Sequence, residues 1–304
     1  MSSLEIDGVT IEDTFAEAFG MRATRLIITA ANPLWARHAA QTATGFATSV
    51  IACGCEAGIE TILSPRETPD GRPGVAILLF AMSSKDLQKQ LERRAGQCVL
   101  TCPSTAAYGG IPAEAVHDWL GLGRSLRYFG DGFQISKLIG GRRFWRIPVM
   151  DGEFVCDDKI GLVKAIGGGN FLILAKDQQA ALAAAERAVA AMNKVKNIIL
   201  PFPGGVVRSG SKVGSKYKTL LASTNDAYCP TLVGLTRSQL SAGVGAVLEI
   251  VIDGLDAPSI RLAMREGIQA ACANGRERGV VRITAGNYGG KLGPHHFHLK
   301  EVLA

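Results

Sequence analysis

The sequence predicts an α+β protein made of two similar ferredoxin-like (split βαβ) α/β sandwich lobes joined by an antiparallel meander. Three observations support this fold class. The chain has 304 residues, 47% hydrophobic and 20% charged, so it can bury a substantial core. Its two halves repeat one order of strand and helix patterns. Between these repeats, residues 125–158 alternate apolar and polar side chains around Gly-Asp-Gly, Gly-Gly and Asp-Gly turns.

The repeat consists of two pieces in each half of the chain. Residues 25–46 read as strand, turn and helix, and residues 170–192 show the same order. Residues 74–110 then read as strand, helix and strand, and residues 245–290 are their counterpart. Each half therefore contains two βαβ-like pieces, as in a sheet with helices on one face.

The two halves also end alike, in Tyr-Gly-Gly at Tyr108 and Tyr288. No linker between them is long or polar enough to separate independent domains. We therefore expect an N-terminal lobe of residues 1–150 and a C-terminal lobe of residues 151–304 that pack against each other.

Charge and apolar patterning limit the classes of function. The 33 Lys and Arg against 27 Asp and Glu give a net charge of +6, which favours anionic partners without identifying nucleic acid. An ordinary solvated surface is the alternative. The most apolar helical run, residues 180–192, is interrupted by Glu186 and Arg187 and is too short to cross a membrane. With no signal-peptide pattern at the N-terminus, we expect a cytoplasmic protein whose seven cysteines are reduced.

Two glycine-rich stretches fail as nucleotide-binding loops. In residues 204–216, GGVVRSGSKVGSK, the P-loop glycine spacing is followed by Ser211 and then Lys212, in the wrong order. Gly167–Gly169 precede a predicted strand, whereas a Rossmann glycine loop lies between strand and helix. We interpret these three glycines as a flexible strand entry.

Metal and covalent chemistry lack sequence support as well. His296 and His298 share one face of the last predicted strand, but no third ligand is placed to complete a metal shell. The sequence has no G-x-S-x-G elbow and no context for a cysteine nucleophile. We therefore expect no bound metal and no covalent enzyme intermediate.

Two polar segments occupy corresponding places in the halves. Residues 67–74, ETPDGRPG, indicate a rigid turn that could wall a cleft. Residues 223–231, STNDAYCPT, gather more hydrogen-bonding groups than a turn requires, as a polar ligand would need.

Glu249 is the most informative single residue. In AVLEIVI it lies mid-strand, on the face of Val247 and Val251, where the duplicate strand VAILLF is apolar throughout. Burial of a carboxyl group raises its pKa and equips it to exchange protons near neutral pH. A structural ion pair with Arg or Lys of the other lobe is the alternative.

Ten stretches of the chain together resemble the formylmethanofuran:tetrahydromethanopterin formyltransferase family. They are distributed from Ile11 to Gly293, which is nearly the whole chain. The stretches are IEDTFAEAF, ATGFATSVI, ETPDGRPGV, YFGDG, GGNF, PFPGGVV, SKVGSKY, STNDAYCPT, EIVIDGL and TAGNYGGKLG.

The resemblance implies two related α/β lobes and a formyl transfer between N5 of tetrahydromethanopterin and a methanofuran-type amine. It implies a metal-free reaction and a homo-oligomeric core. The positive net charge departs from the acidic methanogen members and favours the transferase subunit of a bacterial formyltransferase/hydrolase complex in a methylotroph, running toward formate. The partners would then be the two coenzymes and the other subunits of the complex, with neither nucleic acid nor membrane.

The resemblance also implies roles for named residues. The acidic strand residue of the family falls on Glu249 through EIVIDGL. Asn225 and Tyr228 are candidate oxyanion donors beside this proton-handling group. Substrate-binding candidates come from the Lys- and Ser-rich loop and the polar segment: Lys212, Ser215, Lys216, Ser223, Thr224 and Asp226. The two lysines would suit carboxylate-bearing coenzymes, and Asp226 is the candidate for holding the pterin.

Two other classes of protein remain as alternatives. One is a non-catalytic scaffold subunit that binds a cofactor tail, against which Glu249 and residues 223–231 both argue. The other is a ferredoxin-like nucleic-acid binder, which would need aromatic side chains on strands that are aliphatic here.

Overall fold

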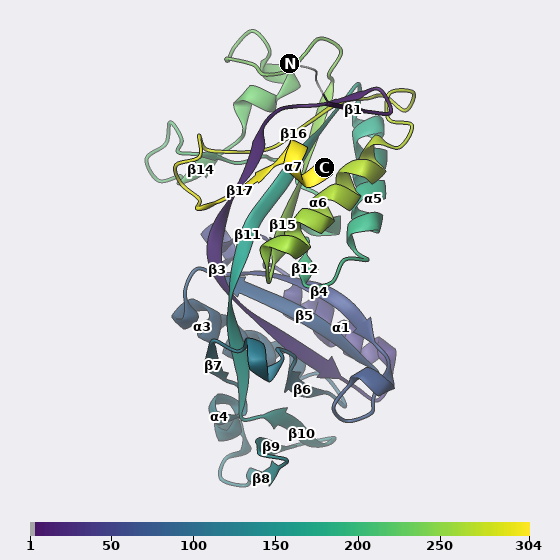
Figure 1. Ribbon diagram of the computed structural model, residues 1–304. Helices are drawn as coiled ribbons and strands as arrows, with labels where there is room; N and C mark the ends of the chain where they lie inside the picture. Colours follow the sequence, from purple (N-terminus) through teal and green to yellow (C-terminus); the bar gives the residue numbers. More distant parts are fainter. Residues whose placement is uncertain (1–3) are drawn as a thin grey trace. The chain divides into compact units, whose positions relative to one another are not determined.

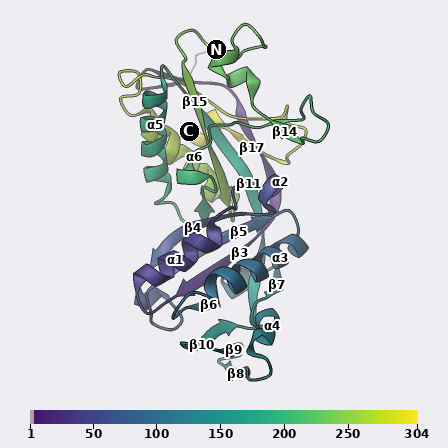
Figure 2. The same ribbon diagram turned by 180° about the vertical axis from the view of Figure 1, so that it is seen from behind.

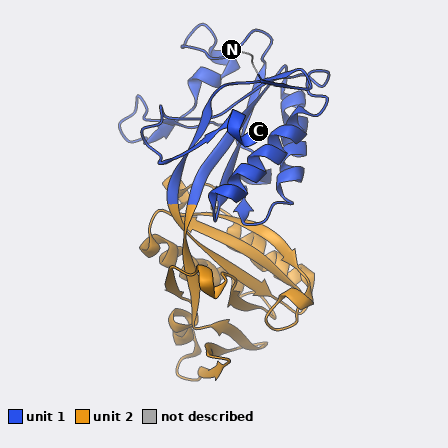
Figure 3. Ribbon diagram, in the orientation of Figure 1, with its two compact units in different colours: residues 1–20, 166–304 blue, residues 21–165 orange. Residues whose placement is uncertain are grey.

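The computed structural model describes residues 4–304, which form two compact units (Figure 3). Unit 1 combines residues 4–20 with residues 166–304, and unit 2 consists of residues 21–165. The first strands of the chain therefore belong to the same compact unit as its C-terminal half. The expected lobes, residues 1–150 and 151–304, divide the chain at one point in the sequence, and this division stays a prediction.

Unit 1 is a sheet with two helices on one face. Helices α5 and α6 pack against each other and cover the sheet together (Figure 1). The strand order β12-β15-β11-β16 is antiparallel at each pairing, and β2 and β1 extend it beyond β16. The elements are β1 (Leu4–Ile6), β2 (Val9–Ile11), β3 (Phe15–Thr29, in part), β11 (Lys159–Ala175, in part), α5 (Gln178–Met192), β12 (Ile198–Ile199), β13 (Lys212–Val213), β14 (Ala222–Ser223), β15 (Ala246–Gly254), α6 (Ala257–Cys272), β16 (Val280–Thr284), β17 (His295–His298) and α7 (Leu299–Leu303).

Local sequence explains why these helices begin where they do. The Asp177 carboxylate accepts the Ala180 N–H at 2.8 Å and caps α5, and Asp256 caps α6 through Ser259 N–H at 2.7 Å. Alanines on α5 let its backbone approach the core, where alternate strand residues meet the helices. The core of unit 1 includes Phe171, Ile173, Ala184, Ala188, Ile250, Ile252, Met264 and Ile268.

Unit 2 has the same plan. Its order β4-β5-β3-β6 is again antiparallel, and α1 and α3 lie on one face of these strands (Figure 2). The elements are α1 (Pro33–Thr44), α2 (Val50–Cys53), β4 (Glu56–Leu63), β5 (Gly74–Ala81), α3 (Ser84–Arg94), β6 (Ala106–Gly109), β7 (Asp118–Gly121), α4 (Gly123–Leu126), β8 (Ile135–Ile139), β9 (Arg142–Val149) and β10 (Gly152–Asp157).

Both units thus place the first strand of a β-α-β-β-α-β run at the centre. The third and fourth strands of each run flank it, and the second lies beyond the third. A mixed α/β architecture and the repeated order of elements agree with the sequence prediction. All seven cysteines are free, as expected.

Two expectations need correction in detail. The antiparallel meander exists as β8, β9 and β10, but it belongs wholly to unit 2 and extends from β6. Gly167–Gly169 do not precede a strand, because β11 already begins at Lys159. Gly168 instead has φ +88°, and the β11–β15 register shifts between Ile166 and Gly169, so the glycines form an irregularity inside a long strand.

Within residues 4–304, the helices are each too short or too polar to span a membrane.

Candidate active site

Glu249 lies in the middle of β15, on the sheet face opposite α5 and α6. Its neighbours Ile250 and Ile252 enter the core beneath the helices, so Glu249 points to the other face. Its backbone is held from both sides. Leu172 of β11 is its register partner, and Val207 exchanges two backbone hydrogen bonds with it, of 2.8 and 2.9 Å. Strand pairing therefore fixes where this carboxyl group projects.

The Glu249 side chain borders a small cavity of about 30 Å³. Protein surrounds the carboxyl group although the residue as a whole is half-buried, and this burial raises the pKa of Glu249 to about 7. None of the ion pairs found among residues 4–304 includes Glu249, so the structural ion pair that the sequence left open is not formed there. The cavity is lined by Leu172, Val207, Arg208, Ser209, Gly210, Asn225, Tyr228, Cys229, Val247 and Glu249.

Asn225 and Tyr228, the other two candidate catalytic residues, line the same cavity. Tyr228 ends a 3₁₀ turn, Asp226–Tyr228, in the long segment between β12 and β15, and Asn225 is the residue that precedes this turn. The Tyr228 hydroxyl donates to Gln239 Oε1 at 2.8 Å, and burial raises the pKa of Tyr228 above its usual range. Its phenol is thus a neutral hydrogen-bonding group at neutral pH. The structure brings all three residues to the lining of one cavity.

The two polar motifs of this segment also meet. Strands β13 and β14 form a short hairpin with Lys212 opposite Ser223. Lys212 Nζ lies 2.6 Å from Asp226 Oδ1, and this hydrogen bond lowers the pKa of Asp226. Lys216 is exposed and its positive charge lowers the pKa of Asp226 further. Two lysines and one carboxylate therefore lie together in the segment that also carries Asn225.

The hydroxyl groups of the substrate-binding candidates form hydrogen bonds with backbone groups of their own segment. Ser223 donates to the Gly214 carbonyl at 2.7 Å, and Thr224 donates to the Ser209 carbonyl at 3.2 Å. Ser215 Oγ accepts the Tyr217 N–H at 3.0 Å. These contacts shape the hairpin, so Lys216 is the candidate most available to a ligand.

Sequence reasoning missed two residues around the cavity and one deeper acid. Arg208 and Cys229 both line the cavity and lie inside the two polar motifs, but nothing in the pattern singles either of them out. Glu17 is 1% exposed, and its carboxylate accepts four backbone hydrogen bonds from residues 288–293. The only sequence signal for Glu17 is its place within IEDTFAEAF.

The histidines of β17 and the turn of residues 67–74 contact other side chains of the fold. The His296 and His298 rings both pack on Phe15, with centroids 4.8 and 5.1 Å away. Asp70, in the turn of residues 67–74, accepts hydrogen bonds from Thr29 and Tyr108 at 2.7 and 3.1 Å. Across residues 4–304, no group of three or more His, Cys, Asp or Glu side chains is placed to hold a metal ion.

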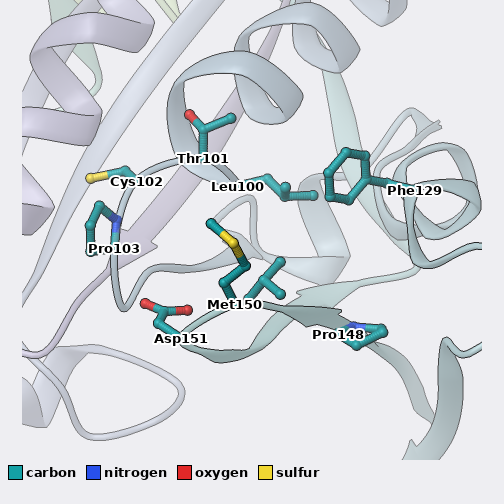
Figure 4. Close-up of a pocket in the computed structure, with 9 residues that line it drawn as sticks. Leu100, Thr101, Cys102, Pro103, Phe129, Pro148, Met150 and Asp151 are labelled. Carbon is teal, nitrogen blue, oxygen red and sulfur yellow. The ribbon is translucent and has the colours of Figure 1, made fainter.

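A larger pocket of about 660 Å³ lies in unit 2 (Figure 4). Its lining is mostly apolar, with Phe129 and Met150 on its walls and Asp151 as its one ionisable carboxyl group. Asp151 already accepts the Ser104 N–H at 2.7 Å. Acid–base chemistry needs a titratable group with a shifted pKa near other donors, so the smaller Glu249 cavity is the better candidate active site.

Comparisons with known proteins identify the family of the chain. The family model "Formylmethanofuran-tetrahydromethanopterin formyltransferase" matches residues 4–149, and "FTR, proximal lobe" matches residues 152–302. The chain belongs to the formylmethanofuran–tetrahydromethanopterin formyltransferase family. It is therefore a formyltransferase. A formylmethanofuran–tetrahydromethanopterin formyltransferase of Methylococcus capsulatus is 67% identical over 98% of this chain and 99% of its own.

Another relative is a subunit of the formyltransferase/hydrolase complex of Methylorubrum extorquens, 52% identical over the whole of this chain and 98% of its own. Solved structures from the family superpose closely. The complex from Methylorubrum extorquens with methylofuran gives a TM-score of 0.96, covering 100% of this chain and 99% of the matched one. The Methanosarcina barkeri formyltransferase, 48% identical, gives 0.92 over 98% and 100%.

Proposed function

We propose that this formyltransferase moves a formyl group between N5 of tetrahydromethanopterin and a methanofuran-type amine, by direct attack in a ternary complex. The observation that carries the proposal is Glu249, a carboxyl group with a pKa near 7 in a cavity that Asn225 and Tyr228 also line. A group that titrates near neutral pH can both accept and return a proton during one reaction. The names of the relatives supply the two coenzymes.

The reaction needs one proton relay. The accepting amine forms a bond to the formyl carbon, and the bond from that carbon to the donating nitrogen then breaks. The attacking nitrogen loses a proton to Glu249, which returns it to the leaving nitrogen. No covalent enzyme intermediate and no metal is required for this balance.

The intermediate carries negative charge on the former carbonyl oxygen. Asn225 and Tyr228 are our candidate donors to that oxygen, and backbone N–H groups of the glycine-containing loop add to them. One such preorganised donor typically lowers the activation free energy by about 3–4 kcal/mol. Tyr228 would exchange its hydrogen bond to Gln239 for one to the substrate.

The β13–β14 hairpin is our proposed site for the anionic parts of the coenzymes. Lys216 is exposed and Lys212 is shared with Asp226, so an incoming carboxylate would compete with Asp226 for Lys212. Ser215, Ser223 and Thr224 hold the hairpin in shape, as their hydrogen bonds to its backbone indicate. Asp226 is also our candidate for holding the pterin.

The wider setting is proposed from the relatives and the topology. One relative belongs to a formyltransferase/hydrolase complex, so we infer a complex subunit that runs toward formate in formaldehyde oxidation, in the cytoplasm and with a homo-oligomeric core. The shared strand order of the units supports two related ferredoxin-like lobes, N-terminal and C-terminal. A non-catalytic scaffold that binds a cofactor tail is the alternative, and the titratable cavity argues against it.

Glu249→Gln tests the catalytic assignment, because Gln keeps the volume and removes titration. We expect kcat for formyl transfer to fall by about 10²–10⁴, the usual loss for a general acid–base group. The KM values for both coenzymes should change far less, since the group acts mainly in the transition state. Steady-state kinetics on purified protein measure both.

Glu266→Gln is the matched control, because Glu266 lies on α6, on the face of the sheet opposite the cavity. It should keep the parental kcat. A folded Glu249→Gln variant with near-parental kcat contradicts the assignment. A parent protein that binds both coenzymes without transfer favours the scaffold alternative.

A further inference from the structure

Glu17 is a buried carboxylate that the proposed reaction does not use. It lies near the start of β3 and pairs with His296 of β17. Its side chain is 1% exposed. Burying a charged carboxylate costs several kcal/mol unless hydrogen bonds or a counter-charge compensate.

Four backbone N–H groups of one loop supply that compensation. Glu17 Oε2 accepts from Tyr288 at 2.7 Å and Gly290 at 2.8 Å, and Oε1 accepts from Leu292 at 2.6 Å and Gly293 at 2.7 Å. Burial by itself would raise the pKa of Glu17, but the four hydrogen bonds outweigh it and hold the pKa at about 2. Glu17 is therefore fully charged at neutral pH.

The loop takes its shape around this charge. Residues 285–294 form neither helix nor strand. Gly289 and Gly290 have φ of +79° and +71°, and a Cβ on Gly293 would lie 2.3 Å from the Ala18 carbonyl oxygen. Successive N–H groups directed at one centre form an anion-binding concavity, and without the anion they would be left unsatisfied.

The same loop borders the Glu249 face of the sheet. Gly286, at its start, donates to Asn170 Oδ1 at 2.6 Å and accepts from Asn170 Nδ2 at 3.1 Å. Asn170 lies two residues before Leu172, the register partner of Glu249. Burial raises the pKa of Tyr288, and the negative charges of Glu249 and then Glu17 raise it further. The Tyr288 phenol is thus neutral and within electrostatic reach of Glu249.

We propose that Glu17 is a positioning residue for formyl transfer, which shapes the loop of residues 286–293 and thereby holds Tyr288 within electrostatic reach of Glu249. Tyr288 provides a neutral phenol whose dipole can act on the proton-handling carboxyl group. The inference rests on the proposed function of Glu249.

A double-mutant cycle in the full chain tests this role. Glu17→Gln places an amide NH₂ against N–H donors and loosens the loop, while Tyr288→Phe removes only the phenol oxygen. We expect Glu17→Gln to lower kcat about tenfold or more, because misplacement by about 1 Å can cost 10²-fold. Tyr288→Phe should cause a similar loss, because it removes the group that Glu17 positions. The double variant should be no slower than the slower single variant, since both changes remove one function. Rate losses that multiply, or a parental kcat in either single variant, overturn the proposal.

Asp256→Ala controls for stability alone. It removes the side-chain cap of α6 and so lowers the thermal midpoint, while kcat should stay parental. A loss of kcat in Asp256→Ala equal to that in Glu17→Gln would attribute the effect to stability and overturn the proposal.

A second variant covers the case in which Glu17→Gln does not fold. The cycle is then run with Glu17→Asp, which keeps the charge but is one methylene too short to reach all four N–H groups. The same non-additivity is expected, and multiplying losses overturn the proposal. Parental kcat in Glu249→Gln contradicts the proposed function instead, whereas an additive cycle in an active parent contradicts only the role of Glu17.

Discussion

Glu249 and Glu17 are carboxyl groups of one compact unit whose surroundings drive their pKa values apart. Burial raises the pKa of Glu249 to about 7. Burial acts on Glu17 in the same direction, but four backbone N–H groups hold its pKa at about 2. The supply of hydrogen-bond donors therefore decides which acid exchanges protons at neutral pH and which stays charged.

Glu249→Gln should stabilise the protein at pH 8 while it lowers activity. A carboxyl group with a raised folded-state pKa favours folding below its unfolded pKa of 4.5, and this contribution is lost as the pH rises through about 7. The shift corresponds to at most about 3 kcal/mol. Thermal midpoints of variant and parent should be similar near pH 4.5 and higher for the variant at pH 8. A lower midpoint for Glu249→Gln at pH 8 would show that the carboxylate is structurally paired.

At the scale of elements, the segment between β12 and β15 brings Asn225 to the cavity. Gly210 has φ +60°, and a Cβ there would lie 2.7 Å from Asn225 Cβ. Gly210→Ala should therefore displace Asn225 and lower kcat about tenfold or more, as misplaced donors do. Gly234→Ala is the matched control, because Gly234 has φ +87° but open space around it. Both variants carry backbone strain of about 1–2 kcal/mol, and only the first should lose activity. Equal kcat in the two variants would remove Asn225 from the catalytic set.

At the scale of the whole molecule, the prediction concerns assembly. The resemblance to the formyltransferase/hydrolase complex of Methylorubrum extorquens extends over the full chain, with a TM-score of 0.96. A tagged chain purified from its native source should therefore bring a hydrolase subunit with it in fixed ratio, measured by mass spectrometry and size-exclusion chromatography. Recovery as a stable oligomer of this chain alone would contradict membership of a complex.

Much of the architecture could be predicted from local patterns of the sequence. The strand and helix order of both units follows from hydrophobic periodicity, which depends on residues close in the chain. The position of Glu249 in mid-strand was predictable for the same reason, since an acid at one place in an apolar strand is a local anomaly. Asn225 and Tyr228 were predicted from the motif STNDAYCPT, and both line the cavity that Glu249 borders.

The tertiary structure alone decided how distant segments meet. Glu17 lies 271 residues before Tyr288, and only the fold of unit 1 brings its carboxylate to that loop. The sequence made Lys212 a candidate for binding the anionic coenzymes, but in the fold its Nζ lies 2.6 Å from Asp226 Oδ1. The environment of a charged group is set by every segment packed around it, whereas sequence patterns report only its neighbours along the chain.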